Sequence, residues 1–246
     1  MLDVRNLEMR FGRVTALAGV SFSAADGSIT GLLGENGAGK TTTLNIVSGL
    51  HRPNRGHVVV DGEAADSPWH RRRSIGALLD QKGLYGRLTV RENVAYFGAL
   101  RGLTGAALTR HVDRALDIVG LLPLANRRTE GFSQGERMKV ALARAIVHEP
   151  RNLLLDEPTN GLDVPSARSF KAALRQMRDR GVCIVFSSHL LGDIAALCDE
   201  VVMIARGRTV AQGDAADFCR RTGCTTLEDA FMALTNVDEG RTCQAG

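Results

Sequence analysis

Short apolar runs alternate with longer amphipathic segments through the second half of the chain. Residues 153–155, 182–186 and 201–204 are continuous apolar runs, each short enough to be a buried strand. Between them, residues from about 164 to 179 and from 190 to 198 place their apolar side chains at helical spacing. Strands that alternate with helices in this way predict an α/β fold with a mainly parallel central sheet.

The N-terminal part of the chain follows a different pattern. Residues 2–9, 20–23 and 57–60 have the composition of strands and are separated by turn-forming residues rather than by helices. The pairs Asp26-Gly27 and Asp61-Gly62 favour tight turns because both residue types tolerate the backbone angles that such turns need. The sequence therefore predicts an antiparallel β layer that packs against the parallel core.

A third pattern, purely helical, covers residues from about 86 to 148. Residues 90–100 and 105–119 carry apolar side chains at helical spacing, and Gly120 and Pro123 mark the end of the second segment. This block interrupts the strand–helix alternation. It predicts an inserted helical subdomain between the first and second halves of the core.

Composition limits the class of protein. The chain has 246 residues, of which 44% are hydrophobic, and this is enough for a substantial core. The formal net charge is only +4, so no basic footprint for nucleic acid is expected. Five cysteines occur without a C-x-x-C pair, which favours the reducing cytosol. No apolar run approaches the roughly twenty residues that span a bilayer, so we expect membrane association only through a partner.

Candidate chemistry begins with a glycine-rich loop between an apolar strand, residues 28–33, and a helix. The spacing of Gly34 and Gly39-Lys40-Thr41 is that of a phosphate-binding loop, in which glycines let backbone N–H groups point at phosphate oxygens. Lys40 can reach the β- and γ-phosphates, and Thr41 offers a hydroxyl to Mg²⁺. A glycine-rich turn that matches by accident is the alternative, but the flanking strand and helix favour a nucleoside triphosphate site. The complete loop consists of Gly34, Glu35, Asn36, Gly37, Ala38, Gly39, Lys40, Thr41 and Thr42.

Two carboxylates end the apolar run at 153–155. A buried parallel strand delivers its last side chains to the edge of the sheet where ligands bind, so Asp156 is placed to hold Mg²⁺. Glu157 follows it and is the candidate that orients and deprotonates the attacking water. The alternative is an ordinary turn capped by acids, because residues 158–161 form a turn sequence. The phosphate loop elsewhere in the chain favours the catalytic interpretation.

Residues 132–136 introduce a helix and have two interpretations. Ser133 and Glu136 have the spacing of a capping box, which is a purely structural device. A serine, a glycine at 135 and a free helix N-terminus also make a second phosphate site. That site lies too far along the chain to serve the nucleotide of the first loop.

The chain resembles the ATP-binding subunits of ABC transporters. The phosphate loop, residues 132–136, residues 153–157, the segment Asn160 to Asp163 and the segment Ser187 to His189 occur in the order found in that family. The resemblance implies a P-loop NTPase core with a mainly parallel sheet, an N-terminal antiparallel β layer and an inserted helical subdomain. It implies one ATP-binding domain over residues 1–235, with a C-terminal tail at 236–246.

The resemblance also implies a partner and a set of roles. Two copies would face head to tail, so that each ATP lies between one copy's loop and Ser133 and Gly135 of the other copy. Asp163 would cross this interface, and His189 would contact the γ-phosphate. Phe11 stands where the family usually places an aromatic ring against adenine; the alternative is a phenylalanine that packs in the core.

Two motifs depart from the family pattern. The signature Leu-Ser-Gly-Gly-Gln is replaced at its first, third and fifth positions by Phe132, Gln134 and Glu136. The glutamine that the family uses to touch Mg²⁺ and to relay to the membrane partner falls on Asp80. Gln81, one place later, is therefore the candidate for that role.

The segments 226–235 and 83–89 resemble ATPase subunits of the sodium-export and drug-export branch, which serve a separate permease chain. This resemblance implies an exporter subunit on the cytoplasmic face of the cell membrane, held there by an integral membrane permease. A soluble ABC ATPase that acts on ribosomes, DNA or an assembly complex is the alternative function. A regulatory module that binds nucleotide without hydrolysis is a third, which the presence of both Glu157 and His189 disfavours. Cargo is not encoded in these motifs.

Overall fold

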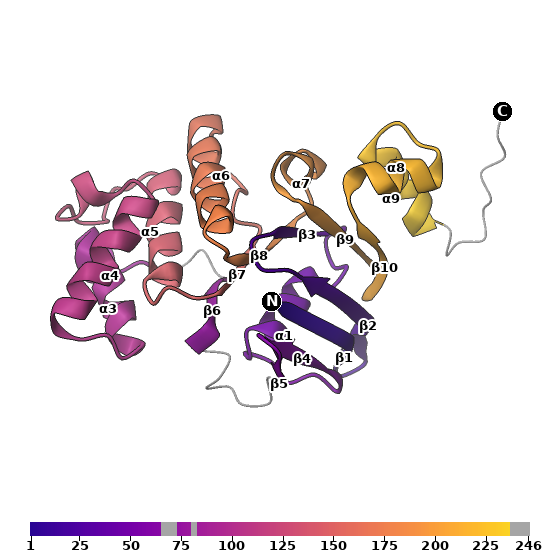
Figure 1. Ribbon diagram of the computed structural model, residues 1–246, viewed down its shortest axis with the longest axis horizontal. Helices are drawn as coiled ribbons and strands as arrows, with labels where there is room; N and C mark the ends of the chain where they lie inside the picture. Colours follow the sequence, from indigo (N-terminus) through magenta and orange to yellow (C-terminus); the bar gives the residue numbers. More distant parts are fainter. Residues whose placement is uncertain (65–72, 80–82, 237–246) are drawn as a thin grey trace.

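Two β-sheets and their covering helices make up the protein (Figure 1). The computed structural model describes residues 1–64, 73–79 and 83–236. One sheet has six strands in the order β10-β9-β3-β8-β7-β6, and the other has four in the order β2-β1-β4-β5. The strands are β1 (Leu2–Phe11), β2 (Val14–Ala24), β3 (Ile29–Leu33), β4 (Arg55–Val60), β5 (Glu63–Ala64), β6 (Ile75–Leu78), β7 (Asn152–Asp156), β8 (Cys183–Ser188), β9 (Glu200–Ala205) and β10 (Arg208–Gly213).

The six-stranded sheet brings the ends of three strands together. The pairs β9–β3, β3–β8, β8–β7 and β7–β6 are parallel, and only β10 runs antiparallel to its neighbour. The register places Leu33 beside Ser188, and Asp156 beside Ser187. The chain therefore leaves β3, β7 and β8 at one edge of the sheet, where a parallel sheet binds its ligands.

The four-stranded sheet is antiparallel and packs on one side of the core. Its inward side chains, such as Leu2, Val20 and Val58, share one buried cluster with Leu154 and Val185 of the larger sheet. Helix α1 (Lys40–Val47) contributes Leu44 and Ile46 to the same cluster. Burial of this apolar surface fixes α1, and with it the loop that precedes α1, against the sheet.

The helices between β6 and β7 form a block of their own at the left of Figure 1. Thr89 and Glu92 form a reciprocal capping box that starts the first of them. The last of them packs against β6, which joins the block to the sheet. The block consists of α3 (Val90–Leu100), α4 (Gly105–Ile118), the short 3₁₀ helix η1 (Leu122–Leu124) and α5 (Gln134–Ile146).

The remaining helices cover the other face of the sheet and the C-terminal end. Helices α6 (Val164–Asp179) and α7 (Leu191–Leu197) connect β7, β8 and β9. Helices α8 (Ala215–Thr222) and α9 (Leu227–Asn236) pack together beyond β10 (Figure 1). Within the part of the chain that the structure describes, no helix is long and apolar enough to cross a membrane.

The predicted fold class is confirmed: a mainly parallel sheet, an antiparallel β layer and an inserted helical block are all present. The predicted helices at 90–100 and 164–179 match α3 and α6 at both ends. The elements that sequence analysis missed are short or polar. Strand β10 has only Ala211 buried, so it carries no apolar run, and β6 has only four residues.

Candidate functional site

The loop between β3 and α1 is built around glycines. A Cβ on Gly34 would stand 2.3 Å from the carbonyl oxygen of Ile204, so only glycine fits where the loop passes β9. Gly39 has φ +110° and stands at the N-cap of α1 without any side-chain cap hydrogen bond. The first N–H groups of α1 therefore remain available to an anionic ligand, as in a phosphate-binding site.

Lys40 is the first residue of α1, and its side chain turns back into the loop. Its Nζ donates to the carbonyl oxygens of Gly34, at 2.6 Å, and of Glu35, at 3.1 Å. The same ammonium lies 3.6 Å from Oε1 of Glu157. The residue is only 5% exposed, so its charge is held away from bulk water. A buried cation inside a loop of open N–H groups fits the phosphates of a nucleotide.

Thr41 and Asp156 join the loop to the end of β7. The Thr41 hydroxyl donates to Oδ2 of Asp156 at 2.7 Å, and the Ser187 hydroxyl donates to Oδ1 of the same carboxylate. A hydroxyl and a carboxylate held side by side are hard oxygen donors of the kind that Mg²⁺ prefers. The residues present therefore fit a magnesium ion at this position.

Glu157 lies between Lys40 and His189. Its backbone has φ +47°, in the left-handed region that a side chain disfavours, and its N–H donates to the carbonyl oxygen and the hydroxyl of Ser187. This backbone aims the carboxylate back at the loop, where Oε2 lies 2.8 Å from Nδ1 of His189. A carboxylate that contacts both a histidine and the loop lysine is placed to accept a proton from water.

Ser133, Gly135 and Asp163 form a second cluster. Ser133 caps α5 by accepting from the N–H of Glu136, whose carboxylate accepts in turn from the N–H of Ser133. A Cβ on Gly135 would stand 2.2 Å from the hydroxyl oxygen of Ser166, so α5 and α6 meet closely here. Asp163 caps α6 by accepting from the N–H of Ser166 at 2.7 Å, and this hydrogen bond lowers the pKa of the carboxyl.

The two clusters stay separate in a single copy. Within residues 1–64, 73–79 and 83–236, no hydrogen bond or ion pair joins Ser133 or Asp163 to the loop at 34–42. Phe11, at the end of β1, is 46% exposed, and its ring meets that of His51 edge-on at 5.7 Å between centroids. Phe11 is therefore not a core residue. Asp80 and Gln81 lie outside the described residues.

Sequence reasoning missed the part that Ser187 plays. This serine contacts both acidic residues of the site, because its hydroxyl donates to the Asp156 carboxylate and accepts from the backbone N–H of Glu157. The signal was its position: a polar residue that ends a buried strand next to the strand carrying the acids.

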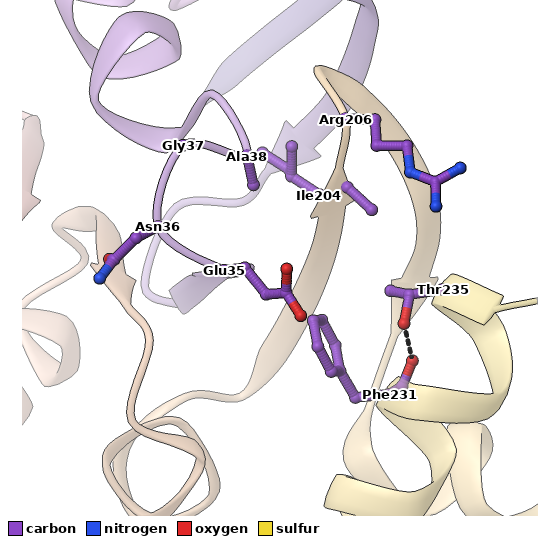
Figure 2. A pocket seen from close by; sticks show the side chains of 9 residues that line it. Glu35, Asn36, Gly37, Ala38, Ile204, Arg206, Phe231 and Thr235 are labelled. Atoms are coloured by element: carbon purple, nitrogen blue, oxygen red, sulfur yellow. Dashed lines mark hydrogen bonds between the residues drawn. The ribbon is translucent and has the colours of Figure 1, made fainter.

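Sequence analysis also missed a hollow of about 270 Å³ beside the loop (Figure 2). Helix α9 lines that hollow with Phe231 and Thr235.

The loop, its lysine and the strand-end acids on a parallel sheet define a P-loop nucleotide-binding protein. The family model of the ABC transporter matches residues 17–160, and the chain belongs to this family as an ATP-binding subunit. Its relatives include the ABC transporter ATP-binding protein NatA of Bacillus subtilis (strain 168). That protein is 41% identical over 89% of this chain and 90% of the relative.

Other relatives carry more specific names. The linearmycin resistance ATP-binding protein LnrL of Bacillus subtilis (strain 168) is 33% identical over 92% of this chain and 73% of its own length. The Nod factor export ATP-binding protein I of Burkholderia lata is 37% identical over 86% of this chain and 70% of its own length. A solved ATP-binding subunit of an ABC transporter superposes with a TM-score of 0.85 at 29% identity, over 96% of this chain and 99% of that one.

Proposed function

We propose that this protein hydrolyses ATP as a head-to-tail homodimer and thereby drives a separate membrane permease that exports its cargo. The observation that carries the proposal is the contact series at the edge of the sheet. Lys40 lies 3.6 Å from Glu157, and Glu157 lies 2.8 Å from His189. A module that only binds nucleotide needs the lysine but not the other two residues. The series therefore supports turnover rather than a purely regulatory role.

The reaction is phosphoryl transfer from ATP to water. As the water oxygen bonds to the γ-phosphorus, Glu157 accepts a proton from that water, and the bond from the γ-phosphorus to the bridging oxygen breaks. ADP leaves with the electron pair, and the proton returns from Glu157 to phosphate or solvent. His189 holds the Glu157 carboxylate and reaches toward the γ-phosphate.

The other site residues hold the substrate. Lys40 and the N–H groups of residues 34–42 stabilise negative charge on the phosphates, and the exposed side chain of Phe11 is the candidate to stack on adenine. Thr41 and Asp156 would hold Mg²⁺, with Gln81 as a further candidate ligand. When bound, Mg²⁺ supplies positive charge that neutralises the phosphate oxygens.

In this proposal, a second copy supplies the residues that cover the bound ATP. Ser133 and Asp163 are exposed, with Gly135 buried beside them, and among the described residues no hydrogen bond or ion pair joins them to the loop of their own chain. In the proposed dimer the surface around them covers the ATP bound to the partner copy, and hydrolysis releases the two copies. Closure and reopening of the dimer move the permease between two states.

The export role rests on relatives rather than on the site. The names of the relatives refer to Nod factor export and to linearmycin resistance, and both fit transport out of the cell. We assign this chain to the cytoplasmic face of the membrane, where a permease would hold it. The cargo is determined by that permease.

The first test is affinity capture of the Glu157→Gln variant with ATP and Mg²⁺ from gently solubilised membranes of its own source. This change keeps the shape of the side chain and removes the base, so we expect a stable ATP-bound dimer and hydrolysis reduced roughly 10²- to 10⁴-fold. The expected co-purifying protein is a multi-span permease. The matched control combines Glu157→Gln with Lys40→Ala and should recover much less of it. Recovery of ribosomes or other soluble assemblies alone would replace the transporter function with the soluble alternative.

A further inference from the structure

The hollow beside the phosphate loop is the starting observation. Three separate segments line it, and their side chains surround an opening next to the loop (Figure 2). Ala38, Ile204 and Phe231 lie buried at its base, whereas the exposed side chains around it, those of Glu35, Asn36 and Arg206, are polar. Figure 2 shows the Phe231 ring directly below the Glu35 side chain. The lining residues are Glu35, Asn36, Gly37, Ala38, Ile204, Ala205, Arg206, Phe231 and Thr235.

A second observation lies on α6. Val164, the first residue of that helix, is 82% exposed, more than any other large hydrophobic side chain among the described residues. It follows Asp163 directly. Isolated exposed apolar residues are common, but this one extends from a surface that the proposed dimer covers.

We propose that, in the ATP-bound homodimer, Val164 of each copy inserts into the hollow of the other copy. The inference rests on the proposed head-to-tail dimer and adds a specific contact to it. The first turn of α6 is held against α5, because Ser166 leaves no room for a Cβ on Gly135. When Ser133 faces the partner's loop, the adjoining turn of α6 lies beside that loop. The hollow is one border of the loop, since it shares residues 35–38 with it.

The charges on the two surfaces are consistent with a contact between α6 of one copy and the hollow of the other. Arg168 lies one turn after Val164 on the same side of α6 and is exposed. The hollow carries one acidic residue, Glu35, and one basic residue, Arg206, among the residues that line it. With Val164 in the hollow, Arg168 therefore pairs with Glu35 of the other copy. The two-fold symmetry of a homodimer forms the contact twice.

The inference gives α9 a function. Helix α9 lies outside the catalytic contacts, yet its Phe231 lines the hollow that receives Val164. Closure of the dimer then presses one copy against the C-terminal helix of the other. The C-terminal helix thus forms part of the receptor for the second copy.

The first experiment measures the dimer dissociation constant of Glu157→Gln by analytical ultracentrifugation with ATP and Mg²⁺. Adding Val164→Asp removes an apolar side chain from the contact and brings a carboxylate next to Glu35 twice per dimer, so we expect the dissociation constant to rise roughly tenfold or more. The affinity of the single copy for a fluorescent ATP analogue should stay the same. The matched control is Leu100→Asp, at a residue that is 65% exposed on α3 and outside the proposed contact.

The outcomes separate the two proposals. If Glu157→Gln alone forms no dimer with ATP, the proposed homodimer is wrong and the inference falls with it. If it dimerises and Val164→Asp leaves the dissociation constant unchanged, the dimer stands and the inference is overturned.

Cross-linking gives a positive test of the same contact. One copy carries Val164→Cys and the other Thr235→Cys, both with Glu157→Gln and with Cys219, Cys224 and Cys243 changed to serine. Burial raises the pKa of the Cys183 and Cys198 thiols to about 12, so these two remain as they are. A short bismaleimide should join the two different copies only when ATP is present. Cross-links between two Val164→Cys copies alone would place Val164 at the symmetry axis and overturn the inference.

Discussion

The N-termini of α1 and α5 differ in how they treat their first backbone N–H groups. Helix α1 has Gly39 as its N-cap, which offers no side chain to cap it, so the first backbone N–H groups of the helix stay open. Helix α5 has Ser133 as its N-cap, inside a capping box that Glu136 completes. The difference matches the two roles that we propose for these helix ends. The N-terminus of α1 would bind phosphate within one copy, whereas that of α5 is a capped helix end at which the hydroxyl hydrogen of Ser133 is the donor for the partner's ATP.

Removing the cation at the open terminus should have the largest effect on binding. Lys40→Ala deletes the buried ammonium that fills the loop, and we expect ATP affinity to fall roughly hundredfold, as for a lost charge-assisted contact. The measurement is isothermal titration of ATP and Mg²⁺ into the single copy. An unchanged affinity would remove the assignment of residues 34–42 as the nucleotide site.

The capped terminus should respond differently. Ser133→Ala removes both the cap and the hydroxyl donor, so we expect the ATP-bound dimer of Glu157→Gln to weaken roughly tenfold while single-copy ATP affinity stays constant. Loss of the cap also lowers the free energy of unfolding by about 1 kcal/mol.

Thr89→Ala is the matched control for Ser133→Ala, because Thr89 and Glu92 form the same kind of box at α3. It should lower stability by a similar amount and leave the dimer unchanged. Equal dimer weakening in both variants would mean that Ser133 acts only as a cap.

A smaller effect is expected at Glu136. Its carboxylate accepts from the N–H of Ser133 at 2.9 Å, and a glutamine amide oxygen can accept the same hydrogen bond. Glu136→Gln keeps the box but removes a negative charge from the terminus that is to meet phosphate. We expect the ATP-bound dimer to tighten roughly two- to fivefold, measured by analytical ultracentrifugation. A weaker dimer would mean that the charge of Glu136 assists the contact.

The smallest effect concerns a third helix end, the cap of α6. The pKa of Asp163 lies below its ordinary value because the carboxylate accepts from the N–H of Ser166. The stabilisation is therefore complete above the ordinary pKa near 3.8 and is lost only as pH falls below it. The melting temperature of the parent should exceed that of Asp163→Ala by the same margin at pH 7 and pH 5. A margin that disappears by pH 5 would contradict this origin.

The sequence was most informative where a local pattern has one physical meaning. Helix α3 was predicted at both ends because its apolar spacing is regular, and the structure adds Thr89 as its N-cap. Residues 34–42 were predicted to be a phosphate loop because glycine, lysine and threonine have separate tasks there. Partner contacts are harder to predict. The hollow joins residues 35–38 to α9, and no local pattern records that two distant segments meet.

The backbone of Glu157 sets a limit on laboratory evolution of this protein. Its φ of +47° is costly for any residue with a side chain, by roughly 1 kcal/mol or more, and glycine would relieve that cost. A selection that rewards only thermal resistance or expression should therefore enrich Glu157→Gly, which discards the carboxylate. Screens for a more robust version of this protein need to score phosphate release alongside survival on heating.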